Sequence, residues 1–511
     1  MTNTVQLGSG AFFVLGLYLA TTLAIGFVAR TRQQSGAPVD YFLGGKATGA
    51  LLLFFTMQAT QYSGNAFFGF TGMGYRNGLI WVLSIPLISL IITTQLSFAP
   101  RLYILSKKHG YLTPADYYAH RFNSVALRLI VAVLTIVSMF PYLMIQAEAA
   151  GHAVVAVSSG SLPFWSGVVF IAIIMGIYIS VGGWRGVIWT DALQGVLLTI
   201  AMLATTFTVV DLAGGLDGVL VTLDRIQPSL LAAPPDIERL TSGWLSLLIV
   251  SAIGFAMYPH AIQRIYAAGS EQALKKSFIA MLFVPFILGA CTLLIGLSGA
   301  ALNPGLEGTQ SDQIFGLLLA RLAAEHYWLV VFVLCGLLAA IMSTASSVVL
   351  TLSSIFTRDI FQTTIKPDAT DHELALAGRL FVVVVLVLVV VASLSTTTTL
   401  WRLTEIKIEF LMQLFPALIL GLYWPRMGRW PAILGIIGGS LVAASMMLTG
   451  HARWWMFQAG LYGFLVNLAI CVVATFATKP AGRVEQQRLS QDFFGLFYAD
   501  GEEQTEQELK V

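Results

Sequence analysis

Hydroxyl side chains crowd one apolar segment of the sequence. Residues 331–354 read VFVLCGLLAAIMSTASSVVLTLSS, in which Ser343, Thr344, Ser346 and Ser347 fall within one and a half helical turns. Ser and Thr hydroxyls are neutral, hard oxygens that suit a partly dehydrated monovalent cation, as carbonyl oxygens do. The alternative is that each hydroxyl bonds to a backbone carbonyl one turn earlier, which is common in membrane helices.

A second apolar segment, Leu51–Gly74, is interrupted in its middle by the polar run Gln58-Ala-Thr-Gln-Tyr-Ser-Gly-Asn65. A continuous membrane helix satisfies its own backbone and gains nothing from polar residues at mid-depth. The run therefore predicts a helix that opens and leaves carbonyl and amide groups free for an ion and a solute. The alternative is a close helix–helix contact, which small residues permit.

These segments belong to a chain that is far too apolar for a soluble globular protein. Of its 511 residues 57% are hydrophobic and 11% are charged, against roughly 25% charged in soluble domains. Nothing in this composition indicates nucleic-acid binding. Apolar blocks of about 20 residues are the length that a helix needs to cross a bilayer. We therefore predict an all-α polytopic membrane protein with about 13 spans, at approximately 10–29, 48–74, 78–100, 125–152, 162–182, 187–213, 243–263, 277–302, 327–355, 376–397, 402–423, 431–449 and 456–478.

The distribution of basic residues predicts the orientation. Arg30 and Arg32 follow the first block, the reverse of a signal peptide, and most of the 28 Lys and Arg fall in segments that are cytoplasmic if the N-terminus lies outside. The C-terminus and the tail 479–511 are then cytoplasmic. In that tail RLSQDFFGLFYA forms either a short amphipathic helix on the membrane surface or an unstructured segment.

The seventh predicted span repeats the interruption of the second. It reads LLIVSAIGFAMYPHAIQRIY and is broken by Gly254 and by Pro259-His260. A proline removes a backbone donor and frees a carbonyl one turn back. An odd offset of five spans gives the two units opposite orientations, and paired interrupted helices of this kind indicate an inverted-repeat transporter.

Ionisable residues inside spans are costly and usually functional. Glu148 lies well inside the fourth span, and His260 follows the proline of the seventh. His260 is either a proton shuttle or a hydrogen-bonded structural histidine. The eleventh span opens with alternating charges, which predict mutual pairing near the membrane interface: Arg402, Glu405, Lys407 and Glu409.

Several separated motifs resemble the sodium:solute symporter family over roughly residues 10–480. They are DYFLGG at Asp40–Gly45, ATQYSG at Ala59–Gly64, GGWRGVIWTDALQG at Gly182–Gly195, YPHAIQR at Tyr258–Arg264, AAIMSTASS at Ala339–Ser347 and FPALILGLYWPR at Phe415–Arg426. The resemblance implies a LeuT-type fold with repeats over spans 2–6 (48–213) and 7–11 (243–423) and discontinuous helices 2 and 7. Two extra helices at 431–478 then complete a single transporter domain, 1–478. TPADYYAHRF and FPYLMIQ make the chain most similar to the pantothenate and monocarboxylate permease branch.

The resemblance also implies a sodium site between the broken second span and the ninth span. Its matching ligands are the carbonyls of Ala59, Tyr62 and Ala340 and the hydroxyls of Ser343 and Thr344. Asp191, in the WTD motif, resembles an ion-exit or gating carboxylate near the cytoplasmic end of the sixth span, although a helix-start cap explains it equally well. Proline-type members carry an acidic residue where this chain has Gln61, which puts a proline-type assignment in doubt.

The family's solute pocket lies where the two broken helices meet the fourth and eleventh spans. The candidate solute-binding residues by matched position are Gln61, Ser63, Asn65, Gln146, Phe255, Tyr258, Pro259, His260 and Gln413. Amide groups suit a carboxylate, and the aromatic rings suit the apolar part of a solute. Each residue has the alternative role of holding helices together.

We therefore expect a sodium-coupled secondary active transporter, not an enzyme. It would import a small organic carboxylate, such as a monocarboxylate or pantothenate, across the bacterial inner membrane by alternating access, with the monomer as functional unit. The first alternative is proton coupling through Glu148 or His260. A transporter-like membrane sensor and a polytopic membrane enzyme are the alternatives from other classes; the enzyme is disfavoured because no His/Asp/Glu or Cys/His cluster stands at one membrane face.

Overall fold

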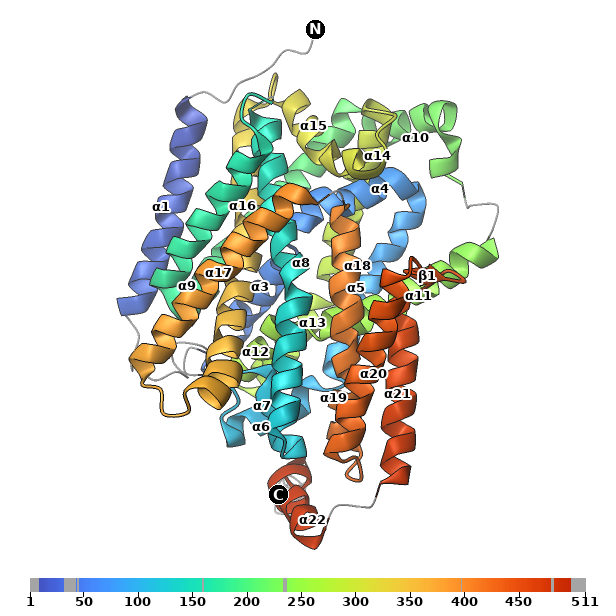
Figure 1. Cartoon of the computed structure of the whole chain (residues 1–511). Coiled ribbons are helices and arrows are strands. Elements are labelled where there is room, and N and C mark those ends of the chain that lie inside the picture. The colour runs from blue at the N-terminus through green and yellow to red at the C-terminus, as the bar shows by residue number, and fades with distance from the viewer. Residues whose placement is uncertain are drawn as a thin grey trace, which may run out of the picture.

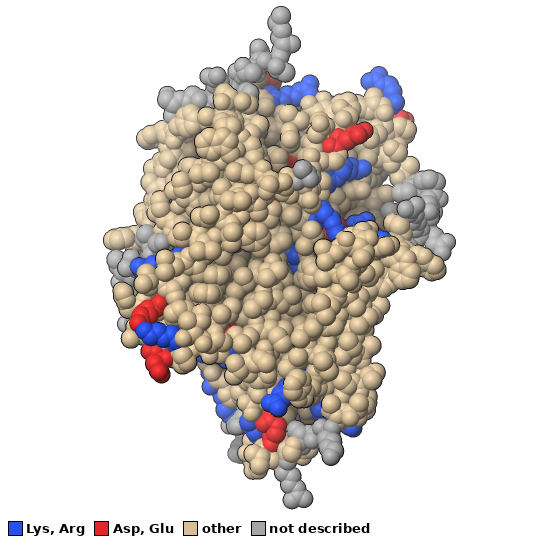
Figure 2. Space-filling model, in the orientation of Figure 1, with Lys and Arg blue, Asp and Glu red and all other residues tan. Residues whose placement is uncertain are grey.

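The computed structural model describes residues 9–31, 43, 46–158, 160–232, 237–396, 398–478 and 482–497. These residues form a helical bundle whose only strands in the described part are a small antiparallel pair, β1 (Arg453–Trp454) and β2 (Phe457–Gln458). Helix α1 (Ser9–Thr31) begins at the top of the bundle, and α22 (Arg483–Leu489) lies at its bottom end (Figure 1). Figure 2 shows a middle zone with few charged side chains and most charged side chains toward the two ends, as expected for a membrane-embedded protein.

The remaining elements follow in chain order. The first half contains α3 (Ala50–Gln61), η2 (Ala66–Phe70), α4 (Thr71–Asn77), η3 (Gly78–Leu83), α5 (Ser84–Leu96), α6 (Ala99–His109), α7 (Pro114–Phe122), α8 (Val125–Val157), α9 (Phe164–Leu212), α10 (Gly215–Ile226) and η4 (Pro228–Leu230). The second half contains α11 (Ile237–Ala256), α12 (Pro259–Ala267), α13 (Glu271–Met281), α14 (Val284–Leu302), η5 (Gly308–Gln313), α15 (Ile314–Leu322), α16 (Tyr327–Ile355), η6 (Phe356–Ile365), α17 (Asp371–Ser395), α18 (Leu400–Leu411), η7 (Met412–Leu414), α19 (Phe415–Tyr423), α20 (Arg429–Leu448), α21 (Ala459–Ala477) and η8 (Ser490–Phe494).

The described residues contain ten helices long and apolar enough to cross a membrane, or up to eleven if the bent pair α11–α12 is one span. The predicted count of 13 is therefore not confirmed. Two features account for the difference. The predicted spans 162–182 and 187–213 both fall in α9, where Phe164–Ile177 is short, and the stretch Ala66–Leu96 joins the end of the second predicted span to the third.

Both predicted interruptions are confirmed. Helix α3 ends at Gln61, the backbone at Tyr62 and Ser63 is not helical, and helix resumes at Gly64. Helices α11 and α12 are bent by 49° at Met257 and Tyr258, where Pro259 supplies no N–H to continue the first helix. The predicted boundaries of the two repeats remain a prediction.

Helix α16 lies inside the bundle and is buried along most of its length (Figure 1). Small residues let its neighbours approach it closely. A Cβ added to Gly64 would stand 2.8 Å from both the Ala149 Cβ of α8 and the Ile341 Cγ1 of α16. The interruption in the second span is thus wedged between two membrane helices, and this position holds the candidate site.

Candidate functional site

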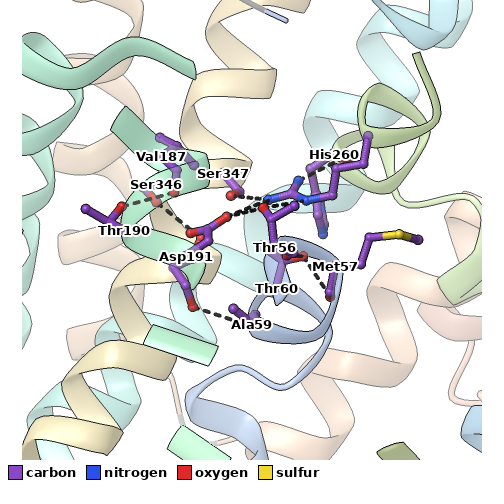
Figure 3. Close-up of polar contacts among 12 residues, drawn as sticks. Thr56, Met57, Ala59, Thr60, Val187, Thr190, Asp191, His260, Ser346 and Ser347 are labelled. Carbon is purple, nitrogen blue, oxygen red and sulfur yellow. Dashed lines mark hydrogen bonds and ion pairs between the residues drawn. The ribbon is translucent and has the colours of Figure 1, made fainter. Parts of the chain in front are cut away.

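The structure brings together three of the five predicted sodium ligands. The Ser343 hydroxyl of α16 donates to the carbonyl of Ala59, near the end of α3, at 2.9 Å. The same hydroxyl lies 3.2 Å from the Ala340 carbonyl on its own helix. The contact with Ala59 ties the interrupted helix to α16, and Figure 3 shows Ala59 and Thr60 beside that helix.

The two remaining predicted ligands differ in kind. Thr344 Oγ1 is buried and has no hydrogen-bond partner in the described part of the chain. Tyr62 is the residue at which α3 stops, with ψ 87°, so its carbonyl lies outside the helical ladder. A buried oxygen without a partner costs free energy unless something binds it. Neutral oxygens from two elements, one of them unpaired, fit a monovalent cation such as sodium.

Asp191 forms a fully buried ion pair with Arg264. Its Oδ2 lies 2.9 Å from Arg264 Nη2, and neither side chain is exposed. Arg264 also donates to Thr56 Oγ1 from Nε at 3.1 Å and to Ser347 Oγ from Nη2 at 2.8 Å, and Thr56 itself donates to Asp191. Figure 3 shows Thr56, Asp191 and Ser347 converging from α3, α9 and α16.

This ion pair lies one helical turn from the candidate sodium site, because Thr56 precedes Ala59 and Ser347 follows Ser343. Asp191 sits inside the continuous helix α9, not in a first turn, so the alternative of a helix-start cap is wrong. A carboxylate and a guanidinium here hold α3, α9, α12 and α16 together next to the site. The WTD motif pointed to Asp191, whereas Arg264 was not singled out from the sequence.

Aromatic candidates for the solute pocket gather at the break between α11 and α12. The Tyr258 ring lies 5.3 Å from that of Phe255, 5.1 Å from that of Tyr142 and 4.9 Å from that of His260, between ring centroids. The Tyr142 hydroxyl donates to the carbonyl of Thr60 at 3.1 Å. The rings of the seventh span thus border the end of α3, directly beside Ala59.

The polar candidates on α3 and α8 join the same region. The Gly64 amide donates to Gln146 Oε1 at 3.1 Å, and the Asn65 amide donates to Ser63 Oγ at 3.2 Å. The Asn65 side chain donates to Thr404 Oγ1 of α18 at 3.2 Å. Gln61 is half-buried at the end of α3. These contacts hold the interrupted segment in place between α8 and α18.

Gln413 does not belong to this group. Its amide nitrogen donates to the carbonyls of Glu409 and Gly460, each at 3.0 Å, and its own carbonyl accepts from the side chain of Asn467 at 2.7 Å. Asn467 and Gly460 lie on α21, among the C-terminal helices. Gln413 therefore packs helices rather than facing the broken segments, as its alternative role implied.

The prediction that Lys407 pairs with its charged neighbours is wrong. Arg402 does pair with Glu405 at 2.9 Å and with Glu409 at 3.3 Å. Lys407 instead turns to the opposite side of α18, where its ammonium stands 3.3 Å from the centre of the Tyr142 ring. The sequence did contain a signal for a special role of Lys407, because a lysine inside a membrane span is costly whichever way its side chain points.

Glu148 is buried on α8, and its Oε1 has no hydrogen-bond partner among the described residues. His260 is buried as well, and its Nδ1 is likewise without a partner there. Neither forms an ion pair in the described part of the chain. Their roles in the proton-coupled alternative stay a prediction.

A cavity of about 570 Å³ opens at the other end of α18, lined among others by Arg76, Arg402, Arg453 and Glu405. Arg453 and Arg402 both contact Glu405, and Arg76 pairs with Asp312 at 2.9 Å. Burial raises the pKa of the Asp312 carboxyl above its usual range, although Arg76 acts in the opposite direction. Figure 2 shows basic side chains gathered at a hollow in this part of the surface.

Comparison with known proteins places this geometry in a family. The sequence profile of the sodium:solute symporter family matches residues 41–439. The chain is 27% identical to the sodium/proline symporter of Haemophilus influenzae, over 91% of this chain and 94% of that protein. It is 26% identical to the sodium/pantothenate symporter of Escherichia coli, over 89% and 94%.

A solved structure confirms the LeuT-type fold. The structure of a Na⁺-coupled sialic acid symporter in a substrate-bound, outward-open state superposes with a TM-score of 0.77 at 21% identity, covering 93% of this chain and 99% of that one. The family match over residues 41–439 includes both broken helices, α16 and α18. The chain therefore belongs to the sodium:solute symporter family, and is a multi-pass inner-membrane protein that co-transports sodium with a small solute.

Proposed function

We propose that this chain couples the entry of sodium to the uptake of a small organic carboxylate by alternating access. The observation that carries the proposal is the contact between Ser343 on α16 and the Ala59 carbonyl on the interrupted α3. The neighbouring Thr344 hydroxyl has no partner among the residues that the structure describes. A cation bound here has Ala59, Tyr62, Ala340, Ser343 and Thr344 within reach and bridges two helices that separate during transport.

Sodium binding then prepares the solute pocket through the interrupted segment itself. Ala59 belongs to the ion site, and the next residue, Thr60, accepts the hydrogen bond of Tyr142, whose ring borders the solute pocket. Fixing the end of α3 on α16 therefore fixes the wall of the pocket as well. The membrane potential adds about 2.3 kcal/mol per charge for each 100 mV to the driving force.

Two observations support a carboxylate as the solute. The solutes named for the relatives and the structural neighbour, proline, pantothenate and sialic acid, are all carboxylic acids. The pocket region combines the Ser63 hydroxyl and the side-chain amides of Asn65 and Gln146 with the aromatic rings of Phe255 and Tyr258. Such a combination suits a compact anion with an apolar body.

We further propose that the N-terminus lies outside and the C-terminus in the cytoplasm. Basic residues concentrate at the end of the bundle that carries α6, α7 and α22, which the positive-inside rule assigns to the cytoplasm. In this orientation the cavity beside Arg402 opens outward, and the Asp191–Arg264 ion pair closes the inner side of the sodium site. The monomer is the functional unit.

The test is thermal melting of the purified protein in sodium and in choline buffer, with a panel of carboxylates, amino acids and sugars. A ligand that binds only the folded state raises stability with the logarithm of its saturation. We expect sodium to enhance stabilisation by carboxylates in the wild type and not in Ser343→Ala or Thr344→Ala.

Ser346→Ala is the matched control, because among the described residues the Ser346 hydroxyl bonds only to the Ser343 carbonyl of its own helix. It should behave as the wild type. Equal stabilisation in choline, or stabilisation that follows pH alone, would contradict sodium coupling and turn attention to Glu148 and His260.

A further inference from the structure

Lys407 stands among aromatic rings in the interior of the bundle. Its ammonium nitrogen lies 3.3 Å from the centre of the Tyr142 ring, 5.0 Å from that of Tyr258 and 5.5 Å from that of Phe255. Its relative exposure is 1%. The three rings come from α8, from the end of α11 and from the break between α11 and α12. The lysine therefore enters the region of the solute candidates from α18.

Several other cations of the helices have charged or hydrogen-bonding partners. The buried Arg121 donates to backbone carbonyls, and three further arginines, of which Arg264 is fully buried and Arg402 and Arg128 are partly exposed, pair with acids. Arg264 pairs with Asp191, Arg402 pairs with Glu405 and Glu409, and Arg128 pairs with Asp116 and Asp359. Within the described part of the chain, Lys407 has ring faces for contacts and neither an acidic partner nor a hydrogen-bond acceptor. Ring faces attract a cation but do not replace a full counter-charge.

An unpaired ammonium in the interior is a large cost that a merely structural residue has no reason to incur. A methionine or leucine would fill the same volume between the three rings without that cost. The position therefore calls for a negative charge that arrives from elsewhere. Under the proposed function, the solute is the ligand that brings a negative charge to this region.

We propose that Lys407 is the specificity-determining residue that recognises the carboxylate of the solute. This inference rests on the proposed function and deepens it, because it names the charge that the pocket selects. The carboxylate takes the ammonium as its partner at the break between α11 and α12. Tyr142, Phe255 and Tyr258 then pack the apolar part of the solute beside it.

The placement also links the two ligands of transport. Tyr142 contacts Lys407 through its ring and the Thr60 carbonyl through its hydroxyl, one residue from the sodium ligand Ala59. A sodium ion at Ala59 and a carboxylate at Lys407 are thus separated by one tyrosine and the end of α3. Each ligand orders an element that the other contacts, which is the physical requirement for coupled binding.

The experiment compares acids with neutral analogues of the same shape. Purified full-length protein is melted in sodium buffer with the pairs lactate and lactamide, propionate and propionamide, and pantothenate and panthenol. The wild type should be stabilised by at least one acid and not by its neutral partner. Lys407→Met should weaken the apparent affinity for that acid by at least about tenfold and abolish the preference.

Lys407→Arg keeps the charge and should retain the preference for the acid, which separates loss of charge from loss of packing. Lys275→Gln is the control, because Lys275 is exposed on α13 and pairs with Glu271. Stabilisation by sodium alone should persist in every variant and shows that the variant is folded. If sodium does not stabilise Lys407→Met, the preference for the acid is compared between Lys407→Gln and Lys407→Arg instead.

The experiment distinguishes failure of the proposed function from failure of the Lys407 assignment. If sodium does not stabilise the wild type, the proposed function is wrong. If sodium stabilises it but no acid is preferred over its neutral partner, or if the preference survives in Lys407→Met, the assignment of Lys407 is overturned. If the affinity depends on the pH and not on whether the solute carries a carboxylate, Lys407 would act as a proton carrier. That result would also overturn the assignment of Lys407 as the carboxylate-binding residue.

Discussion

Breaking the ion pair between Asp191 and Arg264 should destabilise the protein more than any exposed charge change. The two charged groups are 2.9 Å apart, and neither side chain is exposed. Removing one partner of a buried pair leaves the other as an uncompensated charge, at a cost of about 3–5 kcal/mol. We therefore expect Asp191→Asn and Arg264→Gln each to lower the free energy of unfolding by an amount in this range.

The double variant Asp191→Asn/Arg264→Gln discriminates between an ion pair and two independent packing residues. It removes both charges and leaves none stranded, so its cost should be no more than that of either single change, and far below their sum. The coupling between the two changes should therefore reach several kcal/mol.

The assay is unfolding by SDS in mixed micelles, followed by tryptophan fluorescence. Trp184 is a local reporter, because the Arg264 guanidinium lies 5.4 Å from its ring centre. Arg321→Gln serves as control, since Arg321 is exposed and, within the part of the chain that the structure describes, donates only to the Leu302 carbonyl. It should change stability by less than about 0.5 kcal/mol. Single variants within about 1 kcal/mol of the wild type, or costs that simply add, would refute the reasoning.

Three further changes have expected outcomes. Asp116 is buried, which opposes its ionisation, but the guanidinium groups of Arg358 and Arg128 outweigh this and hold its pKa below its usual range; its stabilising contribution is therefore complete above about pH 4 and is lost as the pH falls through the lowered pKa. Asp116→Asn should then lower the melting temperature at pH 7 and flatten the melting profile below about pH 4, and an unchanged profile would contradict the assignment. Gln413→Ala should lower the free energy of unfolding by about 1–3 kcal/mol and leave the solute affinity unchanged, because its hydrogen bonds hold helices together; a selective loss of solute affinity in a binding titration would contradict this. Gly64→Ala should reduce sodium-driven uptake into proteoliposomes, because the added methyl group would stand 2.8 Å from carbon atoms of α8 and α16, and uptake at the wild-type rate would show that this packing is not needed.

The broken helices were predictable from the sequence because their causes are local. The polar run at Gln58–Asn65 and the Pro259-His260 pair stand inside otherwise apolar stretches. Each of them interrupts the backbone hydrogen bonds of a helix. The contact of Ser343 with α3 also followed from a motif. The exact number of spans did not, since α9 remains helical across both predicted spans and the second and third predicted spans run together.

The directions in which individual side chains point could not be predicted from the sequence. Arg402, Glu405, Lys407 and Glu409 alternate in sign along α18, yet three of them pair and the lysine points to the opposite side. Gln413 carries an amide at a position that the family resemblance placed in the pocket, but its partners lie on α21. The rotation of a helix about its axis is set by tertiary packing. The local sequence pattern therefore predicts neither the direction of Lys407 nor the partners of Gln413.

The C-terminal tail offers a third case. The segment RLSQDFFGLFYA was expected to form a membrane-surface helix or to be unstructured, and its described part instead docks on the protein. Arg488 donates to the His120 carbonyl at 3.0 Å, and the buried Phe493 ring lies 6.1 Å from the Tyr117 ring. An apolar helical face can be predicted from the sequence. Whether lipid or protein covers that face depends on the surface of α7, which the local sequence of the tail does not specify.

The most direct test of the account is binding of radioactive ²²Na⁺ to the purified protein without solute, measured by scintillation proximity. Wild type and Ser346→Ala should bind sodium saturably, and Ser343→Ala and Thr344→Ala should each lose most of that binding in protein that remains folded. Saturable binding that is unchanged in both of the latter variants would contradict a sodium site between α3 and α16, and with it the mechanism proposed for coupling.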